Sequence, residues 1–211
     1  MTIVMTLQDL KGPYSAIFSL GINCLPAMEL RAHGLRNMAG PLDWMGTPVL
    51  PNVTRLLRNR FQGMLSYPNL TTIDKANDEL YNVWDREYDL YMNHDFYIHS
   101  NFPPHLAAYP EVKAKYDRRI LRFLHKVESG GRILFIRTDS NYEDIKELAV
   151  TLEQLVTGPF HLLVVNHLPV PELELQDWKL KHVCVVNMPN QDVWYSNRHR
   201  WSFIFDGMWL I

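Results

Sequence analysis

Cysteine is scarce in this chain of 211 residues, which contains only Cys24 and Cys184. Two cysteines cannot build the disulfide framework of a small secreted domain, so a reducing, cytoplasmic setting is predicted. No apolar run approaches the roughly 20 residues of a membrane span, and no membrane partner is expected. The formal net charge of −2, with both signs interspersed, indicates no nucleic-acid partner.

Metal-binding and phosphate-binding motifs are also missing. The chain has no Cys-x-x-Cys or His-Glu-x-x-His spacing, so neither a metal site nor a cofactor is predicted. Gly21 stands alone rather than in a glycine-rich phosphate loop. With 47% hydrophobic residues the chain is long enough for one sizeable core, and we expect a single domain over residues 1–211.

Apolar runs of strand length predict an α/β fold. Near-continuous Val, Ile, Leu and Phe runs are typical of parallel strands that are covered on both faces. We expect such strands at residues 16–20, 133–136, 162–165 and 183–186. We expect helices at residues 25–35, 51–61, 109–128 and 142–156, where apolar residues recur at helical spacing.

Residues 80–96 alternate between apolar and polar side chains, which predicts a β-hairpin, while residues 64–79 are polar and are expected to form turns. The predicted fold class is therefore α/β, a three-layer sandwich with a mostly parallel central sheet and a β-hairpin insertion.

Cys24 follows the first predicted strand, in the run Ser-Leu-Gly-Ile-Asn-Cys-Leu-Pro-Ala at residues 19–27. Pro26 suits the first turn of a helix, because its missing N–H would be unpaired there anyway. A thiol on this strand-to-helix turn faces the free N–H groups of a helix N-terminus, which favour thiolate over thiol. Cys24 is therefore a candidate nucleophile, and the alternative is a small buried residue that closes the turn.

Ligands of open parallel sheets bind at the carboxyl edge of the strands, where we expect Cys24. The polar residues that follow their strands and share this edge are Arg137, Asp139, Asn141, Asn166, His167 and Asn187. Asn23 is predicted to bind a developing oxyanion, together with the backbone N–H groups of residues 23–25. We predict that Asn23, Arg137, Asn141 and Asn166 contact the substrate. His161 and His182 precede their strands and are expected at the opposite edge.

A cysteine nucleophile commonly needs a histidine and a third group that fixes the histidine tautomer. Five histidines are compatible with this role, namely His94, His99, His105, His167 and His199.

Among these five, His94 has the most polar surroundings, at the end of the predicted hairpin. Its neighbour Asp95 points to the opposite face of the strand. Asp43 lies in a loop marked by glycine and proline and is a freer carboxylate, although it can equally serve as a turn residue.

Five short runs, taken together, point to a family. They are residues 19–27, Gly-Pro-Leu-Asp-Trp at 40–44, His-Asp-Phe at 94–96, Lys-Tyr-Asp-Arg-Arg at 115–119 and Leu-Phe-Ile-Arg at 134–137. In this order they resemble a bacterial family described as papain-like cysteine peptidases of unknown function. The resemblance implies Cys24 as the nucleophile and His94 as its partner. The Cys-Gly-Ser-Cys-Trp run of true papain-like enzymes is absent.

The later strands also resemble hydrolases and transferases of the SGNH kind. In that likeness, Asp192 and His199 would form the pair that such enzymes carry near their C-terminus, although the spacing here is longer than usual.

The leading hypothesis is a cysteine-dependent enzyme that acts on an acyl or amide bond, either as a hydrolase or as an acyltransferase. Cys24 attacks the carbonyl, His94 moves the proton and Asp43 orients His94. The substrate would be a small molecule, a glycan or a peptide with an acyl group.

Two other classes of function fit the sequence. One is a non-catalytic module that binds a nucleotide-like or glycan ligand through Arg137, Asn166 and the aromatic residues around Trp84 and Trp194. The other is an interaction protein, in which the apolar residues 206–211 form the interface of a homo-oligomer or a larger assembly.

Overall fold

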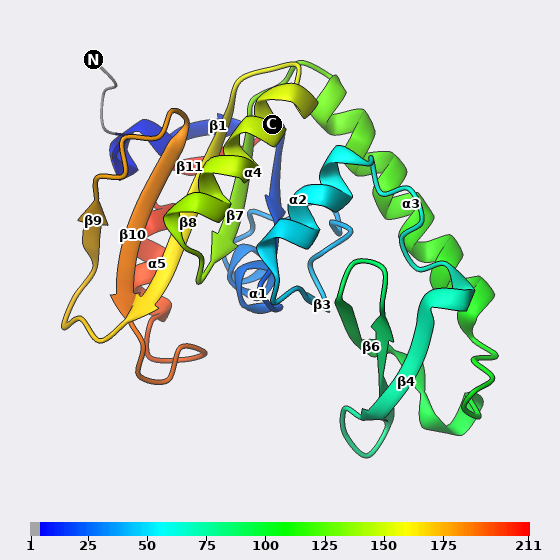
Figure 1. Ribbon diagram of the computed structural model, residues 1–211. Helices are drawn as coiled ribbons and strands as arrows, with labels where there is room; N and C mark the ends of the chain where they lie inside the picture. Colours follow the sequence, from blue (N-terminus) through cyan, green and yellow to red (C-terminus); the bar gives the residue numbers. More distant parts are fainter. Residues whose placement is uncertain (1–4) are drawn as a thin grey trace.

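The computed structural model describes residues 5–211, whose centre is a five-stranded sheet in the order β2-β7-β8-β10-β9 (Figure 1). Its parallel strands are β2 (Ala16–Ser19), β7 (Ile133–Thr138), β8 (Phe160–Leu168) and β10 (Val183–Pro189). Strand β9 (Glu174–Gln176) is antiparallel at one edge. The mostly parallel central sheet predicted from the sequence is thus confirmed.

Helices cover both faces of this sheet. The core on one face includes residues of α1 (Leu25–Ala32) and α5 (Arg198–Phe205). The core on the other face includes residues of α2 (Leu50–Arg58), α3 (Tyr109–Glu128) and α4 (Tyr142–Leu155). Strand residues alternate between these cores, because successive side chains of a strand point to opposite faces. The three-layer sandwich is therefore confirmed.

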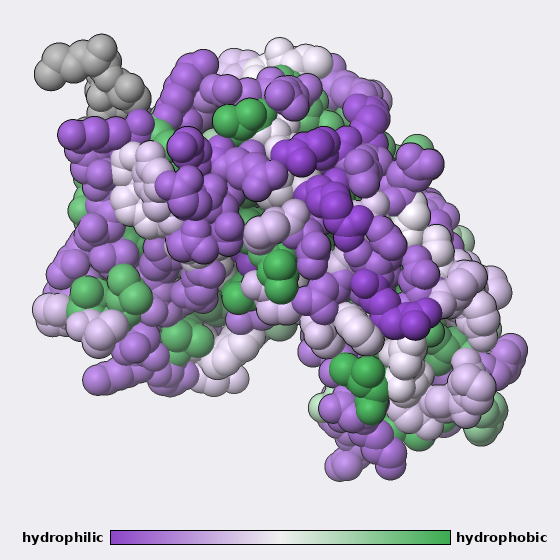
Figure 2. All heavy atoms as spheres, in the orientation of Figure 1, coloured by the Kyte–Doolittle hydropathy of each residue, from purple (hydrophilic) through white to green (hydrophobic). Residues whose placement is uncertain are grey.

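A second, antiparallel sheet adjoins the sandwich and contains the predicted hairpin (Figure 1). Its order is β3 (Met45–Gly46), β6 (Leu90–Tyr97), β5 (Leu80–Asp85) and β4 (Leu70–Lys75). The hairpin is confirmed, but the expectation of turns throughout residues 64–79 is wrong, because β4 lies there. This edge strand exposes most of its side chains and so lacks the apolar alternation of a half-buried strand. Figure 2 shows a notch between the sandwich and this second sheet.

The remaining elements are short. Strand β1 (Gly12–Tyr14) pairs in parallel with β11 (Met208–Leu210), and 3-10 helices occupy Leu7–Leu10, Tyr67–Asn69 and Ile98–Ser100. Helix α1 ends before the predicted residue 35, since Gly34 adopts a positive φ of 69° that no helix continues through. Among the described residues, no helix is both long and apolar enough to cross a membrane.

Candidate active site

The loop after β2 carries Cys24 and is bonded to its neighbours on two sides. Gly21 has a φ of +88°, and a Cβ there would lie 1.9 Å from Thr47 Oγ1, so this position requires glycine. The N–H of Ile22 donates to Thr138 Oγ1 at 3.3 Å, and its carbonyl accepts from the N–H of Thr47 at 2.8 Å. The loop is therefore anchored to the end of β7 and to the segment before α2.

Cys24 is the residue immediately before α1, with Pro26 in the first turn as the sequence predicts. Its side chain is partly buried, and this burial raises the pKa of the Cys24 thiol, opposed by the backbone N–H of Cys24 itself. Burial thus acts against the thiolate that the helix N-terminus is expected to favour, because desolvation penalises the charged form.

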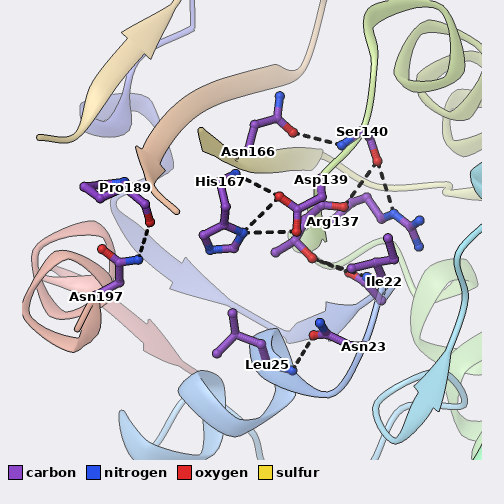
Figure 3. A network of polar contacts seen from close by, with 12 residues as sticks. Ile22, Asn23, Leu25, Arg137, Asp139, Ser140, Asn166, His167, Pro189 and Asn197 are labelled. Carbon is purple, nitrogen blue, oxygen red and sulfur yellow. Dashed lines mark hydrogen bonds and ion pairs between the residues drawn. The ribbon is translucent and has the colours of Figure 1, made fainter. Parts of the chain in front are cut away.

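Asn23 positions the start of α1 rather than pointing freely outward. Its Oδ1 accepts from the N–H of Leu25 at 2.9 Å (Figure 3). One of the three backbone donors predicted for an oxyanion is thus occupied. Within residues 5–211, the side-chain amide nitrogen and the N–H of Asn23 have no hydrogen-bond partner, and the N–H of Cys24 has none besides its own thiol.

Arg137 is fully buried at the end of β7. Its guanidinium donates to the carbonyl of Leu20 at 2.8 Å, to Oγ1 and the carbonyl of Thr47 at 2.7 and 2.8 Å, and to Ser140 Oγ at 3.2 Å. Burial lowers the pKa of Arg137 to about 10, against the attraction of Asp139 and Asp144. The sequence predicts that Arg137 contacts the substrate, but its guanidinium makes four hydrogen bonds that hold three loops of the protein together.

The side chains of Asp139 and His167 are in hydrogen-bonding contact at the ends of β7 and β8 (Figure 3). His167 Nδ1 lies 2.9 and 3.0 Å from the two oxygens of Asp139, and one of these oxygens also accepts from the backbone N–H of His167 at 2.8 Å. Since a carboxylate only accepts, Nδ1 carries the proton. Only 5% of the His167 side chain is exposed, and its Nε2 is buried without a hydrogen-bond partner in the described part of the chain.

The loop of Cys24 and the Asp139–His167 pair are connected through one residue. Thr138 accepts from Ile22 through Oγ1, and its own N–H donates to the carbonyl of Gly21 at 3.2 Å. Asp139 directly follows Thr138, so it is the neighbour in sequence of the residue that is hydrogen-bonded to the Cys24 loop. The parallel order β2-β7-β8 brings these three strand ends to the same edge.

His94 and Asp43, the two residues expected to assist Cys24, do not meet. His94 is exposed on β6, with its ring edge-on to Trp44 at 5.8 Å between centroids. The buried carboxylate of Asp43 accepts from Arg36 Nε at 2.7 Å and from the N–H of Gly40 at 2.8 Å. Within residues 5–211, no hydrogen bond joins Asp43 to an imidazole, which corresponds to its alternative role as a turn residue.

The other carboxylates and histidines weighed as partners are placed elsewhere. Asp95 accepts from Lys115 and, at 2.8 Å, from Tyr116 Oη, so its oxygens face α3. Asp192 and His199 are exposed, and no hydrogen bond between them is present among the described residues. His161 lies at the beginning of β8, at the opposite edge from His167, as expected.

Asn141 and Asn166 lie at the same edge as the Asp139–His167 pair. Asn141 caps α4, since its Oδ1 accepts from the N–H of Asp144 at 3.0 Å. Asn166 is buried, and its Oδ1 accepts from the N–H of Ser140 at 2.9 Å. Both line a cavity that also touches Asp139 and His167. In the part of the chain that the structure describes, no group of three His, Cys, Asp or Glu side chains could hold a metal ion.

The sequence placed Asp139 and His167 at the correct edge but did not pair them. The signal was that each residue comes at the end of a buried apolar strand: Asp139 directly follows β7, and His167 is the second-last residue of β8. Pairing them required knowing that β7 and β8 are neighbours in the register Thr138↔Val165.

The fold and this edge together define an α/β protein with a cysteine and a buried histidine, paired with a more exposed aspartate, on adjacent strand ends. The model of the family described as "Putative papain-like cysteine peptidase" matches residues 15–168, and the chain belongs to this family. The match includes Cys24, Asp139 and His167. The bacterial origin and the cytoplasmic location stay predictions.

One curated relative is an uncharacterized protein of Acanthamoeba polyphaga mimivirus. It is 25% identical over 160 residues, which cover 66% of this chain and 71% of the viral protein. No solved structure matches the chain.

Proposed function

We propose that this protein is a cysteine-dependent hydrolase of amide or related acyl bonds. Cys24 is the nucleophile, His167 is the proton acceptor and Asp139 holds His167 in the reactive tautomer. The observation that carries the proposal is the buried, unpartnered Nε2 of an imidazole whose Nδ1 is already bound to a carboxylate.

An unpaired buried nitrogen costs about 1–3 kcal/mol, so a fold that retains one calls for an explanation. A proton acceptor supplies it, because that nitrogen must be free to accept. His94 lacks this arrangement, as its ring is exposed and contacts Trp44 instead of a carboxylate. The proposal therefore moves the role of base from His94 to His167 and the orienting role from Asp43 to Asp139.

The raised pKa of the Cys24 thiol decides how the reaction begins. A neutral thiol must lose its proton during attack, so the histidine acts as a general base instead of resting in an ion pair with a thiolate. The Sγ–carbon bond forms while the thiol proton moves to His167 Nε2. The imidazolium then gives this proton to the leaving nitrogen as the carbon–nitrogen bond breaks.

Water completes the cycle. His167 removes a proton from water, the hydroxide oxygen bonds to the thioester carbon, and the carbon–sulfur bond breaks. The proton returns to Sγ, and the acid product leaves. The free donors at the start of α1, namely the side-chain amide of Asn23 and the N–H groups of Asn23 and Cys24, would stabilise the oxyanion in both steps.

The test is acylation of the intact protein by an activated ester, followed by mass spectrometry. We expect one acyl group per chain on Cys24 and none after Cys24→Ser. The His167→Ala change should slow acylation about 100-fold or more, the usual contribution of a general base, whereas His94→Ala should change it less than threefold. Thermal melting of each variant controls for folding.

Different outcomes contradict different parts of the proposal. A larger loss from His94→Ala than from His167→Ala would return the base to His94. Acylation that persists in Cys24→Ser, or no acylation of Cys24 at all, would exclude the cysteine hydrolase and leave the ligand-binding module.

The pH dependence of alkylation gives a second check. Iodoacetamide reacts with the thiolate, so a raised pKa predicts a Cys24 rate that still increases above pH 9. A rate that is already constant at pH 6 would indicate a preformed thiolate instead.

A further inference from the structure

A cavity of about 470 Å³ opens beside the Asp139–His167 pair. It lies where the segment leading into α2, the start of α4 and the end of β8 meet, and such a volume is in the range of small-molecule sites. Its walls are Pro48, Leu50, Arg137, Asp139, Ser140, Asn141, Asp144, Asn166, His167 and Leu168. The apolar part of the wall is thus limited to a proline and two leucines.

Asn166 presents an unused donor to this cavity. Only 8% of the residue is exposed, and its Oδ1 is fixed by the N–H of Ser140. Its Nδ2 has no hydrogen-bond partner within residues 5–211, and Figure 3 shows this nitrogen pointing away from Ser140. An accessible amide donor in a cavity wall, on a residue that is otherwise buried and fixed, favours a ligand that brings an acceptor, such as a carbonyl oxygen.

The cavity wall also contains charged side chains, and those that face the cavity are acidic. Asp144 uses one oxygen to accept from Asn141 Nδ2 at 2.9 Å, and its other oxygen has no partner among the described residues. Asp139 is the second carboxylate. The one cationic side chain in the described wall, Arg137, is fully buried and directs its donors to protein oxygens. The ligand-facing charge is therefore negative, which favours a cation.

We propose that this cavity binds the amino-terminal residue of a short peptide. The α-ammonium group lies against Asp144, and the adjacent carbonyl oxygen accepts from Asn166 Nδ2. The assignment rests on the proposed function, since the cavity is the acyl-binding side of the site only if His167 serves the reaction. It makes the protein selective for peptides with a free amino terminus.

Binding is measured by calorimetry on the Cys24→Ala protein, so that no turnover occurs. The probes are alanine amide and its N-acetyl derivative, which differ in the positive charge. We expect alanine amide to bind at least tenfold more tightly. The preference should disappear in Asp144→Asn, which keeps an oxygen for Asn141, and Asn166→Ala should weaken both probes.

The matched control is Glu143→Gln, which removes an adjacent charge from the same helix turn. The side chain of Glu143 is 77% exposed and is not in the cavity wall. This variant should keep the preference for alanine amide. Thermal melting identifies any variant that fails to fold, and Asp144→Glu, which keeps the charge, then replaces Asp144→Asn and should retain the preference.

Equal binding of both probes, no binding of either, or a preference that survives in Asp144→Asn would overturn the inference. These results are separate from the acylation test. If Cys24 is acylated with the help of His167 but alanine amide does not bind, the hydrolase stands and the ligand assignment is wrong. If alanine amide binds but Cys24 is not acylated, the proposed reaction fails while the cavity remains an amine site.

Discussion

Strand β8 carries one histidine near each end, and the two have opposite surroundings. At the amino end, His161 Nδ1 lies 3.2 Å from Arg132 Nη2 and 3.3 Å from Tyr14 Oη. At the carboxyl end, His167 Nδ1 faces the two oxygens of Asp139. One imidazole therefore has an arginine donor beside it, and the other has a carboxylate.

This difference assigns the proton. Burial and the charge of Arg132 lower the pKa of His161 to about 4, so this ring is neutral at pH 7 and accepts through Nδ1. His167 instead donates from Nδ1 and is left with a bare Nε2. The same residue type on the same strand is thus a structural acceptor at one edge of the sheet and a candidate base at the other.

The largest expected effect comes from removing the charge beside His167. Asp139→Asn keeps an oxygen but offers an amide that favours the wrong tautomer, so Cys24 acylation should fall about a thousandfold or more. Asp9→Asn is the matched change near His161, because Asp9 is the carboxylate that interacts with that ring. It should leave the acylation rate within twofold. Similar losses of acylation rate in the two variants would contradict the different roles of His161 and His167.

Two arginines at the neighbouring strand β7 compare the two sheet edges by their effect on stability. Arg132 precedes this strand and Arg137 lies near its end. Arg137 is fully buried, and Arg137→Met would leave the carbonyls of Leu20 and Thr47 without their donor, at a cost of about 3–5 kcal/mol. Arg132 is partly exposed, so water can replace its bonds and Arg132→Met should cost about 1 kcal/mol. Urea unfolding measures both values. Equal losses of unfolding free energy would mean that the buried hydrogen bonds of Arg137 stabilise the protein no more than the exposed ones of Arg132.

The pH dependence of stability should reveal His161. The folded pKa of about 4 lies below an unfolded value near 6.5, so the unfolded chain binds more protons between these pH values. Stability therefore rises from pH 4 to pH 6.5, by about 2 kcal/mol after allowance for the partial exposure of the ring. In His161→Gln this part of the rise should be missing. An unchanged pH profile would contradict the assignment of His161 as a neutral acceptor.

Apart from the matched controls, the smallest effect is expected from Tyr14→Phe at the amino end. Tyr14 Oη donates to the carbonyl of Leu10 at 2.6 Å and also contacts His161. Its loss should lower the free energy of unfolding by about 1–2 kcal/mol, since the buried carbonyl of Leu10 loses its donor. Acylation of Cys24 should not change. A drop in acylation would show that the two edges are coupled through β8.

The fold was largely predictable, because each central strand is buried on both faces and reads as a continuous apolar run. Helix α3 has the bounds that its apolar periodicity predicts. The elements that were missed are exposed or short: β4 and β9 bury little, and α5 lies in a segment without a clear periodicity. Patterning detects only elements that bury a regular face.

The site was predictable only in part. The edge of Cys24, Asp139 and His167 followed from the rule that polar residues after parallel strands share one edge. The choice of His94 rested on its polar neighbours, and local context does not tell which segments of a chain face each other. Asp43 was free in the sequence because its partner Arg36 is seven residues away and joins it only through a folded loop.

By itself, the sequence determined that the central strands exist and which polar side chains lie near their carboxyl ends, since these features depend on hydrophobic burial and on local turn chemistry. The tertiary structure alone decided that β7 lies between β2 and β8, and therefore that a carboxylate reaches His167 and not His94. It also decided that burial raises the pKa of the Cys24 thiol, because this pKa depends on how much water the packed neighbours exclude, and no local pattern records that.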